Sequence, residues 1–229
     1  MIGASTDHVL MRGLSTERVQ RYFDAHASGY DQQFGATERW LLGRHREWAT
    51  SRAAGMVLEL AVGTGLNLPL YGARVGQVLG IDLSEAMLDH ARARSSGLRL
   101  RDRVQVRRAD AQHLDLPDAS VDTVVGTYSL CTFPDPRAAL IEAGRVLRPG
   151  GRLLLVEHGP STSALVRAAQ HMLNPLTVRW QSDHLLRDAR RLVADAGFEI
   201  TETDRVGAAG IVQRVDARKP TLAPGRSHR

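Results

Sequence analysis

Short apolar runs that alternate with helix-like segments constrain the fold of this chain more than any other feature of its sequence. Five such runs occupy residues 56–62, 77–82, 104–110, 121–130 and 152–159. The helix-like segments between them cover residues 66–74, 84–95 and 134–148. Short buried strands that alternate with helices predict a parallel sheet with helices on both faces. A sheet of this kind binds ligands beyond the carboxyl ends of its strands.

Further elements are expected at both ends of the chain. They are a helical region over 15–54 that Gly29 interrupts, helices over 162–180 and 182–196, and paired strands over 198–206 and 210–219. The sequence therefore predicts an α/β, Rossmann-like fold. Its seven-stranded sheet is mostly parallel, ends in a C-terminal antiparallel hairpin and carries helices on both faces.

The length of 229 residues and the hydrophobic fraction of 43% fit one sizeable core. We expect residues 1–54 to form a helical lid on a core over 55–219, the two making one domain. Residues 220–229 are expected to be a flexible tail.

Composition argues against several functional classes. The net charge is +5, but it comes almost wholly from arginine, and the aromatic fraction of 5% is too low for a stacking surface, so no nucleic-acid partner is expected. The single cysteine, Cys131, excludes a disulfide framework and a thiolate zinc cluster. No stretch has the length of a membrane span, and the first residues lack a signal-peptide pattern, so we expect a cytoplasmic protein.

The strongest local motif is VLELAVGTGLN, residues 57–67. A strand carries Glu59, and Ala61, Gly63 and Gly65 form the turn that follows. Glycine is needed where a backbone bends sharply or a ligand approaches it closely. Leu68 stands where the dinucleotide fingerprint requires a third glycine, which argues against a bound pyrophosphate.

Acidic residues close the next two strands. Asp82 ends the second, where a carboxylate is able to accept hydrogen bonds from both hydroxyls of a ribose. Asp110 ends the third, where a carboxylate is placed to meet an adenine amino group. Ser84 is expected to cap the helix after the second strand, and Asp135 to belong to a turn between Pro134 and Pro136, at the start of the segment 134–148.

The motifs E-x-A-x-G-x-G-x-N, D-x-S-x-x-M-L, A-D-A and L-R-P-G-G occur in this order over about residues 57–159. Together they resemble the class I S-adenosylmethionine (SAM)-dependent methyltransferases of the methyltransferase domain 11 type. The resemblance implies SAM as cofactor, S-adenosylhomocysteine as its product, no metal, and a small-molecule acceptor.

The resemblance also implies roles for single residues. Glu59, Gly63 and Gly65 would shape the methionine end of the pocket, and Asn67 is a further cofactor-binding position of the same turn. Ala61 stands where many relatives have glycine. The remaining cofactor-binding positions are Asp82 at the ribose with Leu83 and Met87 beside it, Asp110 and Ala111 at the adenine, Thr127 and Tyr128 near the sulfonium, and Tyr30 closing the site from the N-terminal helices.

A closer resemblance covers the C-terminal part of the chain. The segments that carry it are LLLVEHGPS, NPL (174–176), DHLLRD, AGF and GIVQRV. These segments are similar to phosphatidylethanolamine-type N-methyltransferases, quinone-pathway C-methyltransferases and thiol S-methyltransferases. The main hypothesis is transfer of methyl by in-line displacement to a small, partly apolar molecule with an N, O, S or C acceptor.

Several alternatives stay open. The first is a phospholipid head-group or quinone methyltransferase at a membrane surface, an association that the sequence permits without favouring it. An NAD-linked oxidoreductase and a non-catalytic SAM-binding protein are less favoured, and the oligomeric state is not predicted.

Methyl transfer requires alignment and exclusion of water, and a base only where the acceptor holds its proton tightly. His158, His184 and Tyr128 are the candidate catalytic residues by position. A loop contact for His158 and a helix-start position for His184 are the structural alternatives. In the helix over 162–180, apolar residues such as Leu165 and Leu173 recur at helical spacing, which favours core or lid packing.

Overall fold

The structure is a computed structural model that describes residues 15–98 and 101–221. The first 14 residues of the expected lid, and residues 222–229 of the expected tail, lie outside the described residues.

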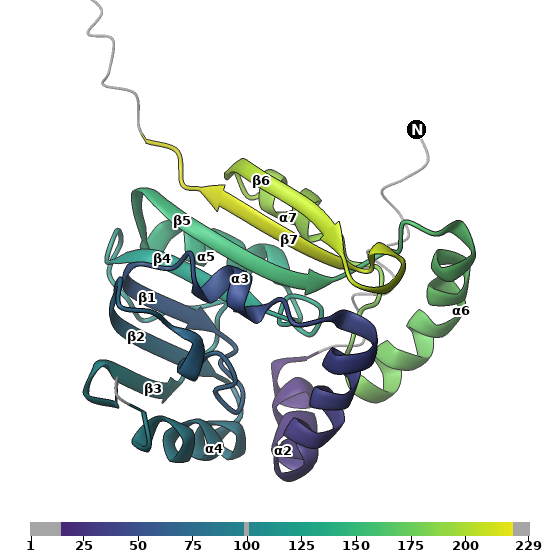
Figure 1. Cartoon of the computed structure of the whole chain (residues 1–229), viewed down its shortest axis with the longest axis horizontal. Coiled ribbons are helices and arrows are strands. Elements are labelled where there is room, and N and C mark those ends of the chain that lie inside the picture. Colours follow the sequence, from purple (N-terminus) through teal and green to yellow (C-terminus); the bar gives the residue numbers. More distant parts are fainter. Residues whose placement is uncertain (1–14, 99–100, 222–229) are drawn as a thin grey trace, which may run out of the picture.

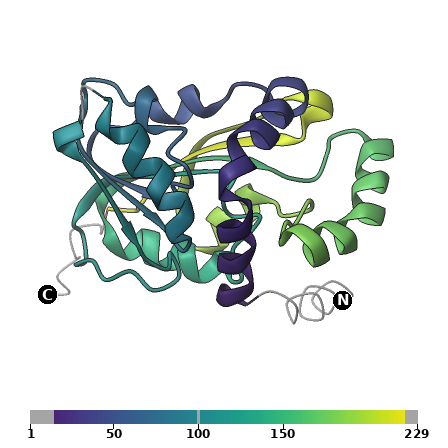
Figure 2. The ribbon, with the colours of Figure 1, turned by 90° about the horizontal axis from the view of Figure 1, so that it is seen from below.

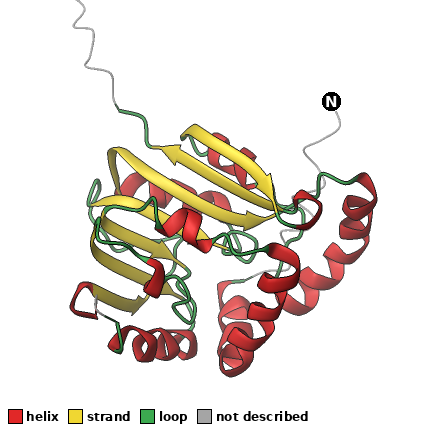
Figure 3. Ribbon diagram, in the orientation of Figure 1, coloured by secondary structure: helices red, strands yellow, loops and turns green. Residues whose placement is uncertain are grey.

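Seven strands form one sheet in the order β3-β2-β1-β4-β5-β7-β6 (Figures 1 and 3). They are β1 (Gly55–Leu60), β2 (Val75–Asp82), β3 (Val104–Arg108), β4 (Val121–Thr127), β5 (Leu147–His158), β6 (Glu199–Val206) and β7 (Val212–Arg218). The first five strands pair in parallel, whereas β7 runs antiparallel to both β5 and β6. The predicted fold class is therefore confirmed, including the C-terminal hairpin.

The strand order determines where a ligand-binding crevice forms at the sheet. The chain builds outward from β1 to β3 and then returns to the other side of β1 with β4. The order of strands reverses at this point, so the loops after β1 and β4 diverge and leave a crevice at their carboxyl ends.

The helical elements surround the sheet. They are α2 (Thr16–Thr37), η2 (Glu38–Leu42), α3 (Arg46–Thr50), η3 (Leu68–Leu70), α4 (Glu85–Ser96), η4 (Arg101–Arg103), α5 (Pro136–Val146), α6 (Ala164–Gln181), α7 (Ala189–Asp195) and η5 (Ala208–Gly210). Ser84 caps α4 by accepting a hydrogen bond from the Met87 N–H, and Asp135 caps α5 in the same way, as the sequence predicts.

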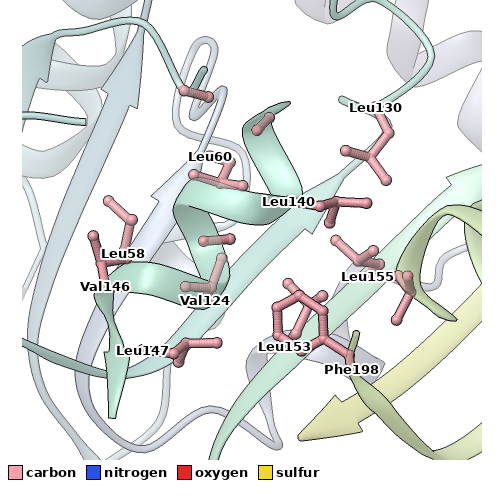
Figure 4. Close-up of a cluster of buried hydrophobic side chains, with 14 of the residues drawn as sticks. Leu58, Leu60, Val124, Leu130, Leu140, Val146, Leu147, Leu153, Leu155 and Phe198 are labelled. Carbon is pink, nitrogen blue, oxygen red and sulfur yellow. The ribbon is translucent and has the colours of Figure 1, made fainter. Parts of the chain in front are cut away.

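Two apolar cores lie on opposite faces of the sheet, because successive side chains of a strand point to opposite faces. Val57 and Val125 belong to the core under α3 and α4. Leu58 and Val124, their neighbours in sequence, belong to the core under α5 and α7 (Figure 4). Burial on both faces explains why the parallel strands read as continuous apolar runs.

Three local predictions are wrong. Residues 66–74 contain only the short turn η3, because Pro69 and Gly72 limit helix growth. The helix α2 continues through Gly29, which is tolerated in a helix of 22 residues that carries good helix formers. The segment 182–196 is a loop up to Asp188, and only α7 is helical, so His184 does not begin a helix.

The helices α2 and α6 stand at the carboxyl edge of the sheet. Figure 2 shows α2 between α4 and α6, with α6 at the periphery of the molecule. None of the helices in the described ranges has the length and apolarity that crossing a bilayer demands.

Gly65 is expected to be essential for the fold of the first turn. Its φ is +82°, and an added Cβ would lie 2.8 Å from Leu68 Cδ1 and 3.2 Å from the Ala91 Cα. Gly65→Ala should therefore lower the free energy of unfolding by about 3 kcal/mol in urea denaturation. Gly72→Ala is the matched control, since nothing lies within 4 Å of its added Cβ, and it should change stability by less than about 0.5 kcal/mol. Equal losses in the two variants would contradict this account.

Candidate active site

A cavity of about 770 Å³, partly open to solvent, lies at the carboxyl ends of β1 to β4. We call it the strand-end cavity. The predicted cofactor-binding residues that line it are Tyr30, Ala61, Gly63, Asp82, Leu83, Met87, Asp110, Ala111 and Thr127. The predicted catalytic residue Tyr128 lines it as well. Residues of the first three sequence motifs thus meet in one place with the segment that follows β4.

Asp82 shapes the centre of the strand-end cavity. One of its carboxylate oxygens accepts a hydrogen bond from the Gly63 N–H at 2.9 Å, and the other accepts one from the Ser84 N–H at 2.9 Å. These bonds tie the end of β2 to the glycine turn after β1. Burial raises the pKa of Asp82 to about 6, although the backbone hydrogen bonds oppose the shift.

Asp110 closes β3 at the far end of the cavity. Its carboxylate accepts hydrogen bonds from the backbone N–H and the side-chain amide of Gln112, both at 2.9 Å. Ala111, between them, is buried. The loop after β3 therefore presents a fixed carboxylate beside a small apolar surface.

Glu59, Asn67 and Gly65 do not line the cavity but support it from behind. The Asn67 amide donates to Glu59 Oε1 at 2.9 Å and to Thr127 Oγ1 at 3.0 Å. The Tyr71 hydroxyl donates to Glu59 Oε2 at 2.8 Å. Burial raises the pKa of Glu59 to about 7, against the effect of these donors. This network joins β1, the glycine turn and β4.

Arg46 brings the N-terminal segment into the same network. One terminal guanidinium nitrogen lies 2.7 Å from Thr127 Oγ1 and 3.1 Å from Asn67 Oδ1, and its Nε lies 3.0 Å from a Glu38 oxygen. Its guanidinium also stacks over the rings of Phe34 and Tyr128. Arg46 lines the strand-end cavity, so it contributes a cation to a site otherwise rich in carboxylates.

Two non-glycine residues of the site adopt left-handed backbone conformations. Ala61 has φ 48° and Tyr128 has φ 54°. Such a conformation costs about 1–2 kcal/mol for an L-residue, which gives a physical reason why glycine would suit the Ala61 position. Strain of this kind concentrates at functional sites.

The helix α2 closes over the strand-end cavity. Ser84 donates to Asp24 at 2.6 Å, and Thr64 donates to Asp31 at 2.6 Å. Arg94 of α4 also pairs with Asp31 at 2.5 Å. These contacts fasten α2 to the turns that follow β1 and β2.

A second cavity of about 1570 Å³, partly open to solvent, lies between α2, η2 and α6. We call it the helical cavity. Its walls are largely apolar and include Phe34, Leu41 and Leu173. It shares Phe23, Tyr30, Tyr128 and Thr132 with the strand-end cavity, so the two spaces meet at these side chains.

Three chemically active side chains line the helical cavity. His158 Nε2 lies 2.9 Å from Asp183 Oδ1, and Cys131 is buried beside them. Burial opposes a charge on His158, but the attraction of Asp183 outweighs it and raises the pKa of the imidazole. Burial would raise the pKa of Asp183 in turn, but His158 lowers it below its usual value.

The same three residues bring potential metal ligands within 4.8 Å of one another. His158 and Asp183 already pair with each other, and burial raises the pKa of the Cys131 thiol well above its ordinary value. A thiol held in this form is a poor ligand, because metals bind the thiolate. The expectation that no metal takes part stays a prediction.

Buried charges also fix the loop after β4. Glu157 accepts hydrogen bonds from the backbone N–H groups of Ser129 and Leu130, at 2.9 and 3.1 Å. Arg187 donates to the carbonyls of Leu130 and Phe133 from the other side. The loop that carries Tyr128 and Cys131 is thereby held in one position at the junction of the cavities.

A model of the methyltransferase-domain family matches residues 58–155. The chain is 36% identical over 187 residues to the phosphatidylethanolamine N-methyltransferase of Cereibacter sphaeroides, with 80% of this chain and 88% of that protein covered. It is 34% identical to the demethylmenaquinone methyltransferase of Lactiplantibacillus plantarum, with 65% of this chain and 66% of that protein covered.

This chain belongs to the SAM-dependent methyltransferases. It is an enzyme of that family, and the NAD-linked oxidoreductase considered above is not supported. Solved structures agree on the fold of the methyltransferase. Geranyl diphosphate methyltransferase in complex with GPP and sinefungin has a TM-score of 0.68 at 15% identity, covering 89% of this chain and 98% of that one. A possible histamine N-methyltransferase from Thermotoga maritima has a TM-score of 0.66 at 23% identity, covering 87% and 99%.

The predicted catalytic residues of the methyltransferase lie in different surroundings. Tyr128 and His158 line the cavities, whereas His184 is not among the residues that line either of them. Burial lowers the pKa of His184 to about 4, so its imidazole is neutral near neutrality. Sequence reasoning missed Arg46 and Asp183. Asp183 stands directly before His184 in the segment DHLLRD, and this adjacency was the available signal.

The network around Glu59 is expected to contribute strongly to stability. Glu59→Ala would leave the Asn67 amide and the Tyr71 hydroxyl without their buried acceptor, and should lower the free energy of unfolding by about 3 kcal/mol in urea denaturation. Glu59→Gln keeps the volume and one acceptor oxygen, and should lose less. Identical stability of the Ala and Gln variants would rule out this role.

Proposed function

We propose that the methyltransferase binds SAM in the strand-end cavity and transfers its methyl group to a small, partly apolar acceptor in the helical cavity. The observation that carries this proposal is the junction of the two cavities at Phe23, Tyr30, Tyr128 and Thr132. A pocket with two carboxylates and an arginine on its walls, beside a larger apolar one, suits a charged cofactor and an apolar acceptor that must meet with water excluded.

The chemistry of the strand-end cavity fits SAM. Asp82 supplies acceptors for two ribose hydroxyls, and Asp110 supplies an acceptor for an adenine amino group. Arg46 is the cation that we assign to the methionine carboxylate. An added Cβ at Gly63 would meet only the Ala61 carbonyl oxygen, at 4.0 Å, which leaves free space at the turn for a ligand to approach the backbone.

SAM supplies an electrophilic methyl group and a sulfur leaving group, so the protein has to orient the acceptor and remove its proton where it has one. We assign proton removal to His158, with Asp183 as the positioning residue. Because Nε2 faces Asp183, Nδ1 is the nitrogen that accepts the proton. Asp183 then balances the positive charge on the imidazole. The Tyr128 hydroxyl is buried without a hydrogen-bond partner among the described residues, which leaves it for the acceptor.

Binding of S-adenosylhomocysteine is expected to depend on pH through Asp82. The ribose hydroxyls require an ionised carboxylate, and the pKa of Asp82 before binding is about 6. Affinity should therefore be full well above pH 6, where Asp82 is ionised, and fall as the pH drops through 6. Calorimetric titration across this range measures the effect.

Asp82→Asn is the control for this dependence. It should weaken binding about tenfold or more and remove most of the change around pH 6, since charge-assisted hydrogen bonds contribute about 1.5–3 kcal/mol. Near-normal affinity in Asp82→Asn would refute the ribose assignment. Binding of NAD instead of S-adenosylhomocysteine would refute the cofactor.

For a phenol or thiol acceptor, the acidic limb of the pH profile of kcat/KM should reflect the ionisation of His158. The base must be neutral, so activity should rise through an apparent pKa above the ordinary 6.5 of histidine. Asp183→Asn removes the attraction but not the burial, and should move this limb to lower pH by about one unit. Cys131→Ser, on the same wall, should leave the limb in place. An unmoved limb in Asp183→Asn would exclude the pair from proton transfer.

A second candidate is methylation of an amine head group of a lipid. Aromatic side chains line the helical cavity, including Tyr22, Phe23, Tyr30, Phe34 and Tyr128. Their ring faces attract cationic nitrogen. The phosphatidylethanolamine N-methyltransferase among the relatives acts on such a group by its name.

An acceptor panel decides between these candidates. Purified protein with radiolabelled SAM is offered thiols, phenols, small amines, a demethylated quinol and phosphatidylethanolamine in detergent micelles. Transfer to the water-soluble members supports the main proposal, and transfer to the lipid alone supports the second. A parallel series with EDTA tests the metal-free expectation, and transfer to none of the acceptors despite tight S-adenosylhomocysteine binding would overturn both candidates.

A further inference from the structure

The helix α6 is oriented with its polar side inward. Gln170 accepts a hydrogen bond from the Ser161 N–H at 2.7 Å and donates to the Gly159 carbonyl at 2.9 Å. Asn174, which is buried, accepts one from the Leu185 N–H at 2.8 Å. The inward side of α6 is thus held by hydrogen bonds to the loops after β5 and α6. An amphipathic surface helix usually turns its apolar face inward instead.

The apolar side of α6 faces solvent. Leu165, Met172 and Trp180 have exposed fractions of 83%, 79% and 70%. At 100° per residue, these three positions and Ala169, Leu173 and Leu176 fall within an arc of about 100°. This exposed face, which we call the α6 stripe, runs the length of the helix. The expected core packing of Leu165 and Leu173 is therefore wrong, because the hydrogen-bonded face of the helix takes the inward position, although Leu173 also lines the helical cavity.

The helix α6 carries no negative charge, since the segment Ala164–Gln181 contains Arg167 and Arg179 and no acidic residue. At 100° per residue Arg179 borders the α6 stripe, whereas Arg167 lies on the inward side and donates to the Ser161 carbonyl at 2.6 Å. Across the helical cavity, η2 exposes Trp40, at 82%, and Leu41. Exposed apolar and tryptophan side chains beside arginines are the composition of a helix that lies in a membrane interface.

We propose that the α6 stripe, together with Trp40 and Leu41, docks the protein onto the surface of an anionic lipid bilayer. The apolar side chains would enter the boundary between head groups and acyl chains, and Arg179 at the border of the stripe would stay at the phosphate level. A second copy of the chain fits this face less well. A twofold contact through the stripe would place Arg179 of each copy at an interface to which the helix brings no acidic residue.

The helical cavity lies where docking would bring its rim to the membrane. Leu41, Val166 and Leu173 are exposed and also line the cavity, so the rim of the cavity lies on the docking face. An apolar acceptor dissolved in the bilayer would enter the cavity without crossing water. This step rests on the proposed function, whereas the docking itself does not.

Flotation with lipid vesicles tests the docking in the absence of SAM and acceptor. The full chain is mixed with phosphatidylcholine vesicles that contain or lack phosphatidylglycerol. We expect binding to the anionic vesicles that weakens as salt is added. The triple variant Leu165→Gln, Met172→Gln and Leu176→Gln should lose about tenfold or more of this partition, since each side chain contributes apolar area and Gln keeps helix propensity.

Ile141→Gln is the matched control, because Ile141 is an exposed apolar residue on α5, outside the stripe. It should bind vesicles as the wild type does, and both variants should keep S-adenosylhomocysteine affinity. No vesicle binding by the wild type, or equal binding by the triple variant, would overturn the proposal. A wild-type dimer that the triple variant dissociates, without vesicle binding, would assign the stripe to a second copy. Failure of S-adenosylhomocysteine binding would refute the proposed function and leave the docking result standing.

Discussion

The geometry of the active site depends on a carboxylate buried inside the sheet. Glu59 is only 2% exposed, and its two oxygens accept hydrogen bonds from Asn67 and Tyr71. Through Asn67 the network reaches Thr127 and Arg46, so the position of one strand residue fixes the glycine turn, the end of β4 and the N-terminal segment. A buried polar network of this kind defines one arrangement, since any other would leave polar groups unpaired at a cost of about 1–3 kcal/mol each.

The same principle recurs along the edge of the sheet. Asp82 fixes the backbone after β1 and β2, and Glu157 fixes the backbone after β4. In each case a strand ends in a carboxylate that accepts backbone N–H groups of a neighbouring loop. The sheet is therefore a rigid apolar frame, and its acidic ends hold the loops that carry Tyr128 and Cys131. The helical cavity lies outside this frame, between α2, η2 and α6.

Sequence reasoning succeeded where local pattern and topology agree. Apolar runs followed by Asp82 and Asp110 identify the strands and their functional ends, because a parallel sheet brings all carboxyl ends to one edge. It failed where tertiary contacts decide. The period of α6 shows an apolar stripe but not which way it faces, and only the partners of Gln170 and Asn174 settle that. Arg46 acts through Thr127, far away in the sequence, so neither spacing nor composition identifies it, and the pairing of Asp183 with His158 is likewise a tertiary contact.

The fastening of α2 has a kinetic consequence. Asp24 and Asp31 bind the turns after β2 and β1 across the mouth of the strand-end cavity. A molecule that passes α2 on its way in or out therefore waits until these side chains separate. Residence time on the enzyme would then be governed by the fluctuations of one helix more than by the contacts of the ligand itself. Turnover would in that case be limited by how often α2 separates from these turns, whatever the rate of methyl transfer.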